Sequence, residues 1–193
     1  MKMRACALLL LVIGVAIMAS SAGAAQVQSP DAMATQLSDP SVLATSSETI
    51  TDSTGSYIAT SSAALDTAVT NATIGSDGYL CGNVGYNATY RWKTLGGLLT
   101  SWTYRSHFAV HVCHDKVTGL VSLYDEPVDS IPTWSWCGSI VRSWAMNPNN
   151  ASAHSYTKGC FALYDKVVVA EYPWAKMTIG GNGGLWVRTT GVN

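Results

Sequence analysis

Apolar and polar residues alternate with a period of two along much of the second half of the chain, as they do in β-strands with one buried face. The clearest case is the segment 107–114, in which Phe108, Val110 and Val112 share one face and the residues between them share the other. No segment of this half keeps the period of an amphipathic helix. Comparable alternating segments occur at 88–95, 98–105, 120–125, 139–146, 155–164, 167–172, 174–179 and 185–190.

Turn-forming residues separate these segments. Residues 115–119 predict a hairpin loop, and the run Gly-Gly-Asn-Gly-Gly at 180–184 supplies the positive-φ positions that a tight hairpin needs. Short strands joined by turns in this way are typical of a sandwich or a closed barrel. We therefore predict an all-β fold, an antiparallel β-sandwich or closed barrel of about eight or nine short strands, preceded by a disordered arm.

The start of the chain has the three-part layout of a secretory signal peptide. Lys2 and Arg4 precede an apolar stretch at 5–19, and a run of small residues follows at 20–25. A transmembrane anchor is the alternative, but it needs ~20 apolar residues and this stretch is shorter. We therefore expect residues 1–25 to be removed and the mature protein to be secreted, extracellular or cell-wall associated, with no membrane span after cleavage.

The segment that follows differs in composition from the rest of the mature chain. Residues 26–77 are rich in Ser, Thr and Ala, contain six acidic residues and no Lys or Arg, and hold one aromatic residue, Tyr57. Such a segment offers little apolar surface to offset the entropy that is lost on ordering. We predict a disordered arm or stalk, or a propeptide removed during maturation, in front of a disulfide-bonded all-β domain at 78–193.

Four of the five cysteines lie in the predicted domain, and the fifth, Cys6, would be lost with the signal peptide. An even number of cysteines in an exported chain predicts two disulfides, for which three pairings exist. The pairing Cys81–Cys113 with Cys137–Cys160 is favoured because each bond then closes a short loop. No two cysteines have the Cys-x-x-Cys spacing of a zinc site, so the sequence predicts no metal and no other cofactor.

The histidine-rich segment 107–115 is where an active site would first be sought. His114 follows Cys113, which suggests a Cys–His nucleophile pair, but neighbours on a strand point to opposite faces. His107 and His111 are ~13 Å apart on an extended strand, too far to share a metal ion. We interpret these histidines as polar residues on the outer face of a sheet, and keep a hydrolase that uses His111 or His114 with a nearby carboxylate as an alternative.

Tryptophan is the most informative residue type, because seven occur in the predicted domain. A small sandwich core accommodates roughly three or four such rings, so the others should reach the surface. Trp134 and Trp136 share one face if the chain is extended, and Trp102 and Tyr104 form a similar pair. Exposed rings of this kind stack on sugars or anchor protein interfaces. The alternative is that the rings fill the core, as Trp does in immunoglobulin-type sandwiches.

No motif in the sequence names an activity. The chain has no Gly-x-Ser-x-Gly, no phosphate-binding glycine loop and no His-Glu-x-x-His, and its formal net charge of -1 predicts no nucleic-acid partner. We therefore expect a secreted non-catalytic binding domain, with extracellular or cell-wall carbohydrate held by Trp134, Trp136, Trp102 and Tyr104. A protein-binding module that recognises an extracellular protein, such as an inhibitor or a toxin-like factor, is the other alternative.

Overall fold

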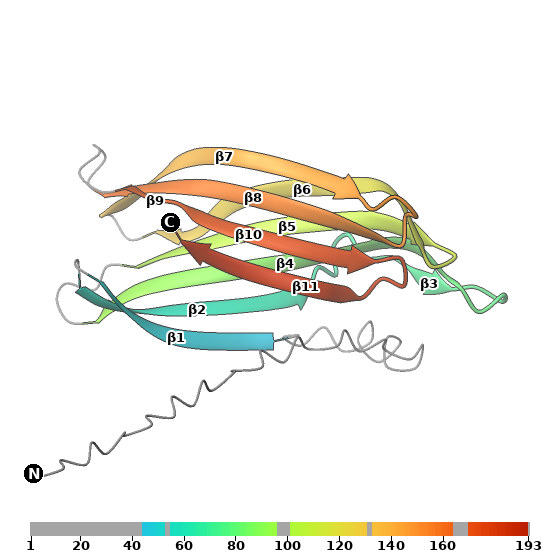
Figure 1. Ribbon diagram of the computed structural model, residues 1–193, viewed down its shortest axis with the longest axis horizontal. Coiled ribbons are helices and arrows are strands. Elements are labelled where there is room, and N and C mark those ends of the chain that lie inside the picture. Colours follow the sequence, from blue (N-terminus) through green and yellow to red (C-terminus); the bar gives the residue numbers. More distant parts are fainter. Residues whose placement is uncertain (1–43, 53–54, 96–100, 131–132, 164–169, 193) are drawn as a thin grey trace, which may run out of the picture.

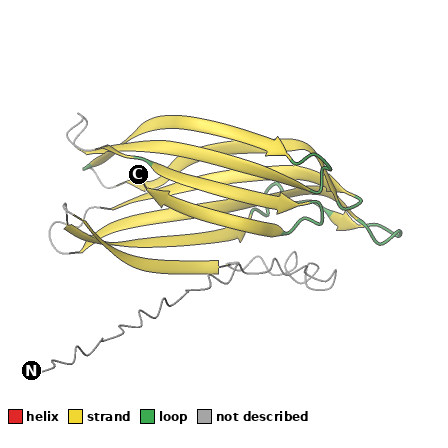
Figure 2. Cartoon of the chain, in the orientation of Figure 1, coloured by secondary structure: helices red, strands yellow, loops and turns green. Residues whose placement is uncertain are grey.

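The computed structural model describes five segments of the chain, residues 44–52, 55–95, 101–130, 133–163 and 170–192. Within these segments the chain forms strands and loops without a helix (Figure 2), so none of the described residues belongs to a helix that could cross a membrane. The predicted signal peptide at 1–25 lies outside the described residues. The described strands are β1 (Ala44–Asp52), β2 (Gly55–Leu65), β3 (Thr73–Ile74), β4 (Leu80–Leu95), β5 (Ser101–Cys113), β6 (Lys116–Ser130), β7 (Trp134–Met146), β8 (Ser152–Leu163), β9 (Ala170–Glu171), β10 (Pro173–Gly180) and β11 (Leu185–Val192).

The strands form two antiparallel sheets that pack against each other (Figure 1). The first sheet has the order β1–β2–β4–β5–β6, with β3 beside β4. The second sheet has the order β11–β10–β8–β7, with β9 beside β8. The two sheets do not join into one closed sheet, so the fold is a β-sandwich and not a closed barrel. The all-β prediction is confirmed.

Alternation along the long strands decides which side chains fill the space between the sheets. In β4 the side chains that fill the core are at even-numbered positions from Val84 to Trp92, and in β5 they are at even-numbered positions from Trp102 to Val112. The odd-numbered residues of β8 and β10 face them from the second sheet, and Phe161 is one of these. The rings of Trp102 and Phe161 stack with their centroids 4.8 Å apart. The part of the core around Trp102 and Phe161 is therefore built from aromatic rings.

Polar contacts also join the two sheets. Tyr104 of β5 donates its hydroxyl hydrogen to Thr157 Oγ1 of β8 at 2.7 Å. The buried carboxylate of Asp125 on β6 accepts hydrogen bonds from Arg142 Nε and Ser139 Oγ of β7, both at 2.6 Å. A carboxylate can be buried in this way only when partners replace the water it loses. These bonds hold the edge strand β6 against β7.

The structure corrects the predicted extent of the disordered arm. β1 and β2, both within the predicted arm at 26–77, pair with each other, and β2 pairs with β4 along its length. The inward side chains of β2 include two alanines between Tyr57 and Leu65, and the many Ser, Thr and Ala residues of the segment made it look like low-complexity sequence. Residues 26–43 lie outside the described residues. The buried residues of β2 are Tyr57, Ala59, Ala63 and Leu65.

The strands are longer than predicted, and the hairpin between β5 and β6 is tighter. β5 runs without interruption through Ser106, where the pattern suggested a break. The loop predicted at 115–119 is instead a turn centred on His114 and Asp115, whose φ angles are 53° and 57°. Two consecutive left-handed residues are what a type I′ turn requires, and this turn matches the twist of the strands on either side. The predicted glycine-rich hairpin at 180–184 is present between β10 and β11.

Both disulfides are present with the pairing that the spacing favoured. Cys81–Cys113 joins β4 to β5, at positions that face each other in the first sheet. Cys137–Cys160 joins β7 to β8 in the second sheet. Each sheet therefore has its own covalent link between neighbouring strands, and neither bond connects one sheet to the other.

Candidate functional site

Three of the four residues predicted to stack on a ligand lie in the core. Trp102 and Tyr104 are 0% exposed and Trp134 is 5% exposed, so none of these rings is available to a ligand. Trp136 is half-buried, and its ring lies against Gly159 beside Tyr104. The reason is the alternation of β5 and β7, which turns these positions toward the opposite sheet. The buried rings therefore fill the core, which was the alternative to a ligand-binding surface.

His114 does not point away from Cys113 as the sequence suggested. Its Nδ1 atom lies 3.1 Å from Cys113 Sγ and 3.9 Å from Cys81 Sγ. The left-handed backbone at His114 brings the ring back over the sulfurs, whereas an extended backbone would have separated them. The two sulfurs and this nitrogen are close enough to share a metal ion. The sulfurs are bonded to each other, however, and only a thiolate is a good metal ligand.

His114 and His111 each contact the side-chain oxygen of one other residue. His114 Nε2 lies 3.1 Å from Asp77 Oδ2, and a hydrogen bond from the backbone N–H of Tyr79 lowers the pKa of Asp77. His111 Nδ1 lies 2.7 Å from Thr118 Oγ1. Neither ring, within the described part of the chain, has a carboxylate on one nitrogen and a hydroxyl on the other.

Aromatic rings and lysines cover the outer face of the second sheet. The β8–β10 register pairs Trp174 with Lys158 and Lys176 with Tyr156, and paired residues project from the same face. The Lys176 ammonium lies 5.6 Å from the centroid of the Tyr156 ring and 5.5 Å from that of Trp174. The Lys158 ammonium lies 5.3 Å from the centroid of the Tyr172 ring. Rings and cations therefore lie next to each other across the two strands.

Two tryptophan rings on this face lie directly against glycines of a neighbouring strand. A Cβ atom at Gly191 would come within 2.7 Å of the Trp174 ring, and one at Gly180 would overlap the Trp186 ring. Any other residue at either position would force the ring to shift away from the backbone. Trp186 is nevertheless 49% exposed. We call this surface the aromatic–lysine face; it consists of Tyr156, Lys158, Tyr172, Trp174, Lys176 and Trp186.

A groove of about 420 Å³ lies on the same face, between β7, β8 and β10. His154, Tyr156 and Lys176 line it together with Trp144 of β7, and none of the described lining residues is acidic. Neither Lys158 nor Lys176 forms an ion pair with an acid in the described segments. The aromatic–lysine face is therefore positively charged and rich in hydrogen-bond donors.

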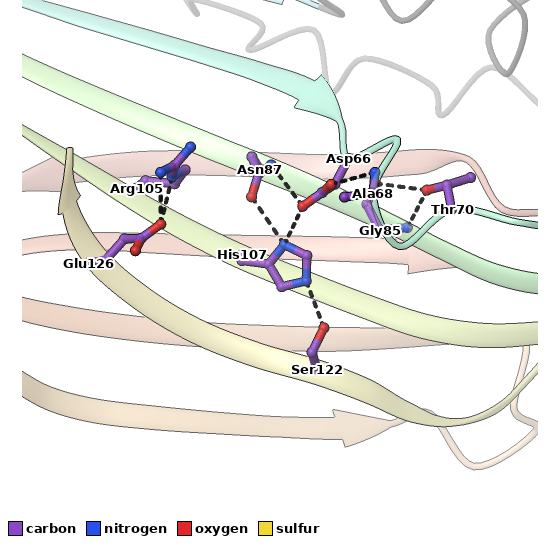
Figure 3. A network of polar contacts seen from close by, with 9 residues as sticks. All are labelled: Asp66, Ala68, Thr70, Gly85, Asn87, Arg105, His107, Ser122 and Glu126. Carbon is purple, nitrogen blue, oxygen red and sulfur yellow. Dashed lines mark hydrogen bonds and ion pairs between the residues drawn. The ribbon is translucent and has the colours of Figure 1, made fainter.

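A second polar cluster lies on the outer side of the first sheet (Figure 3). His107 is 0% exposed there, because the loop after β2 and the ring of Tyr124, whose centroid is 4.4 Å away, cover it. His107 Nδ1 lies 3.0 Å from both Asp66 Oδ2 and Asn87 Oδ1. His107 Nε2 lies 2.7 Å from Ser122 Oγ. We call these four residues, Asp66, Asn87, His107 and Ser122, the His107 network.

The surroundings of His107 decide its charge and its tautomer. Burial lowers the pKa of the imidazole, and the neighbouring carboxylate of Asp66 opposes this effect without cancelling it. The ring is therefore neutral near pH 7. Because Nδ1 faces two oxygen acceptors, it carries the ring proton, which leaves Nε2 to accept a hydrogen bond from Ser122.

Sequence reasoning missed the His107 network for two reasons. Asp66 lay in a segment interpreted as disordered, and Ser122 lay on a different strand without a motif around it. One local signal existed: Asp66 ends the alternation of β2, and its side chain accepts a hydrogen bond from the N–H of Ala68 at 3.0 Å, which is an Asx turn. That signal predicts a turn, but it does not predict that the turn folds onto His107.

The described residues thus hold two candidate sites, one on the outer side of each sheet. No protein-family model, curated protein or solved structure matches the chain. The comparisons therefore assign no family and no function, and the two sites have to be interpreted from their own chemistry.

Proposed function

We propose that the protein is an exported binding module that holds an extended extracellular or cell-wall polysaccharide on the aromatic–lysine face without cleaving it. The observation that carries the proposal is the placement of Trp174 and Trp186 against glycines of the neighbouring strand. Rings set this close to the backbone form part of the sheet surface itself. A carbohydrate platform on this face replaces the one expected from Trp102 and Trp134, whose rings are buried.

The length of the face favours a linear polymer over a single sugar. Trp174 and Gly180, on which Trp186 lies, are six residues apart on β10, which corresponds to ~20 Å along a strand. The pair of Tyr156 and Lys176 lies between them. Aromatic rings can stack on the apolar faces of sugar units, and an array of this length can contact several units of one chain.

The polar side chains on this face suit hydroxyl-rich ligands. The groove contributes Lys176, His154 and the hydroxyls of Ser143 and Thr189. Aromatic walls with a few well-placed polar groups are the usual composition of small-molecule and sugar sites. Glycoside hydrolysis would instead require two carboxylic acids facing each other, and the described lining residues include none. This supports binding without cleavage.

The disulfides support the exported part of the proposal. Such bonds persist in oxidising compartments and are rare in the cytosol, and the chain has one in each sheet. An extracellular location would also bring the aromatic–lysine face into contact with wall or matrix polysaccharides.

The test is a binding assay on a glycan array and on insoluble polysaccharides, with the oxidised chain starting at residue 26. The chain must not be shortened to residue 78, because β2 is an inner strand of the first sheet. We expect Trp174→Ala and Trp186→Ala each to weaken binding by about tenfold or more, as truncation of a central aromatic contact commonly does. Tyr79→Ala removes a 43% exposed ring from the turn between β3 and β4 and is the matched control, with unchanged affinity expected.

Two results would overturn the proposal. If both tryptophan variants keep the affinity of the parent protein, the polysaccharide lies somewhere else. If no polysaccharide binds and a purified extracellular protein does, the aromatic–lysine face is a protein interface.

A further inference from the structure

The His107 network has the atom order of a serine-hydrolase triad. A carboxylate, Asp66, contacts Nδ1 of the imidazole at 3.0 Å, and a hydroxyl, Ser122, contacts Nε2 at 2.7 Å (Figure 3). In a triad the carboxylate fixes the tautomer so that Nε2 can remove the proton of the serine hydroxyl. The neutral state and the tautomer of His107 are the ones this role requires.

The carboxylate in this network is held in place from several sides. Asp66 Oδ1 accepts a hydrogen bond from the N–H of Ala68 at 3.0 Å, and Oδ2 accepts one from Asn87 Nδ2 at 3.0 Å. The loop that carries it is fixed to β4, because the Asp66 N–H donates to the Gly85 carbonyl at 2.7 Å and the Gly85 N–H donates to Thr70 Oγ1 at 3.0 Å. None of these bonds involves Ser122. The need to anchor the loop therefore does not explain why the Ser122 hydroxyl lies against His107 Nε2.

Ser122 lies where a substrate can reach it. It is partly exposed, whereas His107 behind it is buried. It follows a β-bulge in which Val121 has no partner residue on β5, and bulges often redirect a side chain beside an active site. β6 is the last strand of its sheet, so backbone N–H groups on its outer edge have no partner within that sheet, and one of them, that of Val117, donates instead to the Asn150 carbonyl at 2.7 Å. Such groups can stabilise the oxyanion that forms during acyl transfer.

The side chains around Ser122 indicate the class of substrate. Tyr124, which is 38% exposed, lies on the same face as Ser122 and stacks on His107, and Val121, the bulge residue next to Ser122, is 40% exposed. A surface of this kind favours an apolar acyl or aryl group over a charged one. It is also separate from the aromatic–lysine face, which belongs to the other sheet.

We propose that Ser122 is a nucleophile that accepts the acyl group of an apolar ester, with His107 as its base and Asp66 as the positioning residue. Ser122 Oγ bonds to the ester carbonyl carbon while its proton passes to His107 Nε2. The C–O bond to the alcohol then breaks, and the alcohol leaves with that proton. Water attacks the acyl-serine, gives a proton to Nε2, and the acid is released as Ser122 regains its hydrogen.

The test is covalent labelling of the folded, oxidised chain from residue 26 with an alkyl fluorophosphonate, in which a serine–phosphorus bond replaces the phosphorus–fluorine bond. Intact mass and peptide mapping should show one adduct, on Ser122. Ser122→Ala should abolish the adduct and the hydrolysis of p-nitrophenyl butyrate, while Ser76→Ala, which removes an exposed hydroxyl from a turn, should change neither.

Asp66→Asn tests the positioning role, and we expect labelling to slow by about tenfold or more because the carboxylate no longer fixes the tautomer. Asn71→Ala is its control, since Asn71 holds the same loop by accepting from the Asn83 N–H at 2.8 Å but does not contact His107. Equal slowing in both variants would mean that Asp66 only anchors the loop. An unlabelled Ser122 in the folded protein, or an adduct that persists in Ser122→Ala, would overturn the proposal while leaving polysaccharide binding untouched.

Discussion

On the outer face of each sheet, glycine lets another group approach the backbone closely. One of these faces is buried by that group, and the other remains exposed. On the first sheet, Gly85 leaves room for Val69 of the loop after β2, so the chain covers its own sheet and buries His107. On the second sheet, two glycines leave room for Trp174 and Trp186, whose rings remain part of the surface. A glycine within a strand indicates that something approaches the backbone closely. Where a loop approaches the glycine, the loop covers the face and buries it. Where a tryptophan ring approaches it, the ring itself becomes part of the exposed surface.

The largest difference in unfolding free energy is expected between a variant that removes a core ring and a variant that removes a ring of the aromatic–lysine face. Trp102→Ala should lower the free energy of unfolding by about 3–5 kcal/mol, because it empties a fully buried site next to Phe161. Trp186→Ala should cost less than about 1 kcal/mol, because half of that ring is already in water. Urea titrations of both variants measure the difference, and equal losses would mean that the outer ring is structural.

Removal of one disulfide at a time compares the two sheets directly. The bonds close segments of 32 and 23 residues, for which the loop-closure relation gives about 3–4 kcal/mol each. The double variants Cys81→Ala/Cys113→Ala and Cys137→Ala/Cys160→Ala should therefore lose similar amounts of unfolding free energy. If one variant is almost as stable as the parent protein, loop closure does not account for that disulfide.

The buried histidine should make the first sheet sensitive to acid. The pKa of His107 is lowered in the folded state by burial, so below its ordinary value of 6.5 the unfolded chain takes up a proton that the folded protein does not. Stability is thus at its full value above that pH and falls as the pH drops toward the folded-state pKa. Three charged neighbours also act on the pKa of His107. The carboxylates of Asp66 and Glu126 raise it, and the guanidinium of Arg105 lowers it further.

Urea midpoints measured between about pH 7.5 and about pH 5 test this expectation, since histidine titrates in that range. The parent protein should lose stability across the range, and His107→Gln should lose less because the substituted side chain does not titrate. The same slope in both proteins would assign the acid sensitivity to other groups.

The smallest effect is expected from the cations of the aromatic–lysine face. Lys176→Ala removes an ammonium that lies over the rings of Tyr156 and Trp174, and cation–π contacts at exposed sites contribute about 0.5–1 kcal/mol. Lys116→Ala, at an exposed lysine of β6, is the control and should be neutral. If Lys176→Ala loses no more unfolding free energy than Lys116→Ala, the contacts between the Lys176 ammonium and the rings do not stabilise the protein.

The parts of the fold that follow from local pattern could be predicted. The alternation of Phe108, Val110 and Val112 is confirmed as the inner face of β5, and the spacing of the cysteines gave the correct disulfide pairs. β2 could not be predicted in this way, because two of its four buried residues are alanines, and their burial depends on rings that the neighbouring strand β4 supplies. Composition alone made it resemble a linker.

The candidate sites depended on contacts between distant residues. The abundance of tryptophan suggested an aromatic surface, but only the sheet order shows that Trp102 and Trp134 face inward while Trp174 and Trp186 face outward. Asp66 and Ser122 are 56 positions apart, and neither carries a motif.

The sequence by itself determined the fold class, the alternation of the long strands and the disulfide pairs, because each of these depends on residue type and on short-range spacing. Tertiary structure alone decided which face of each strand the opposite sheet covers, and that the loop after β2 folds onto His107. The physical reason is that burial and hydrogen-bond partners belong to pairs of distant segments, and a strand pattern fixes two faces without saying what covers either of them.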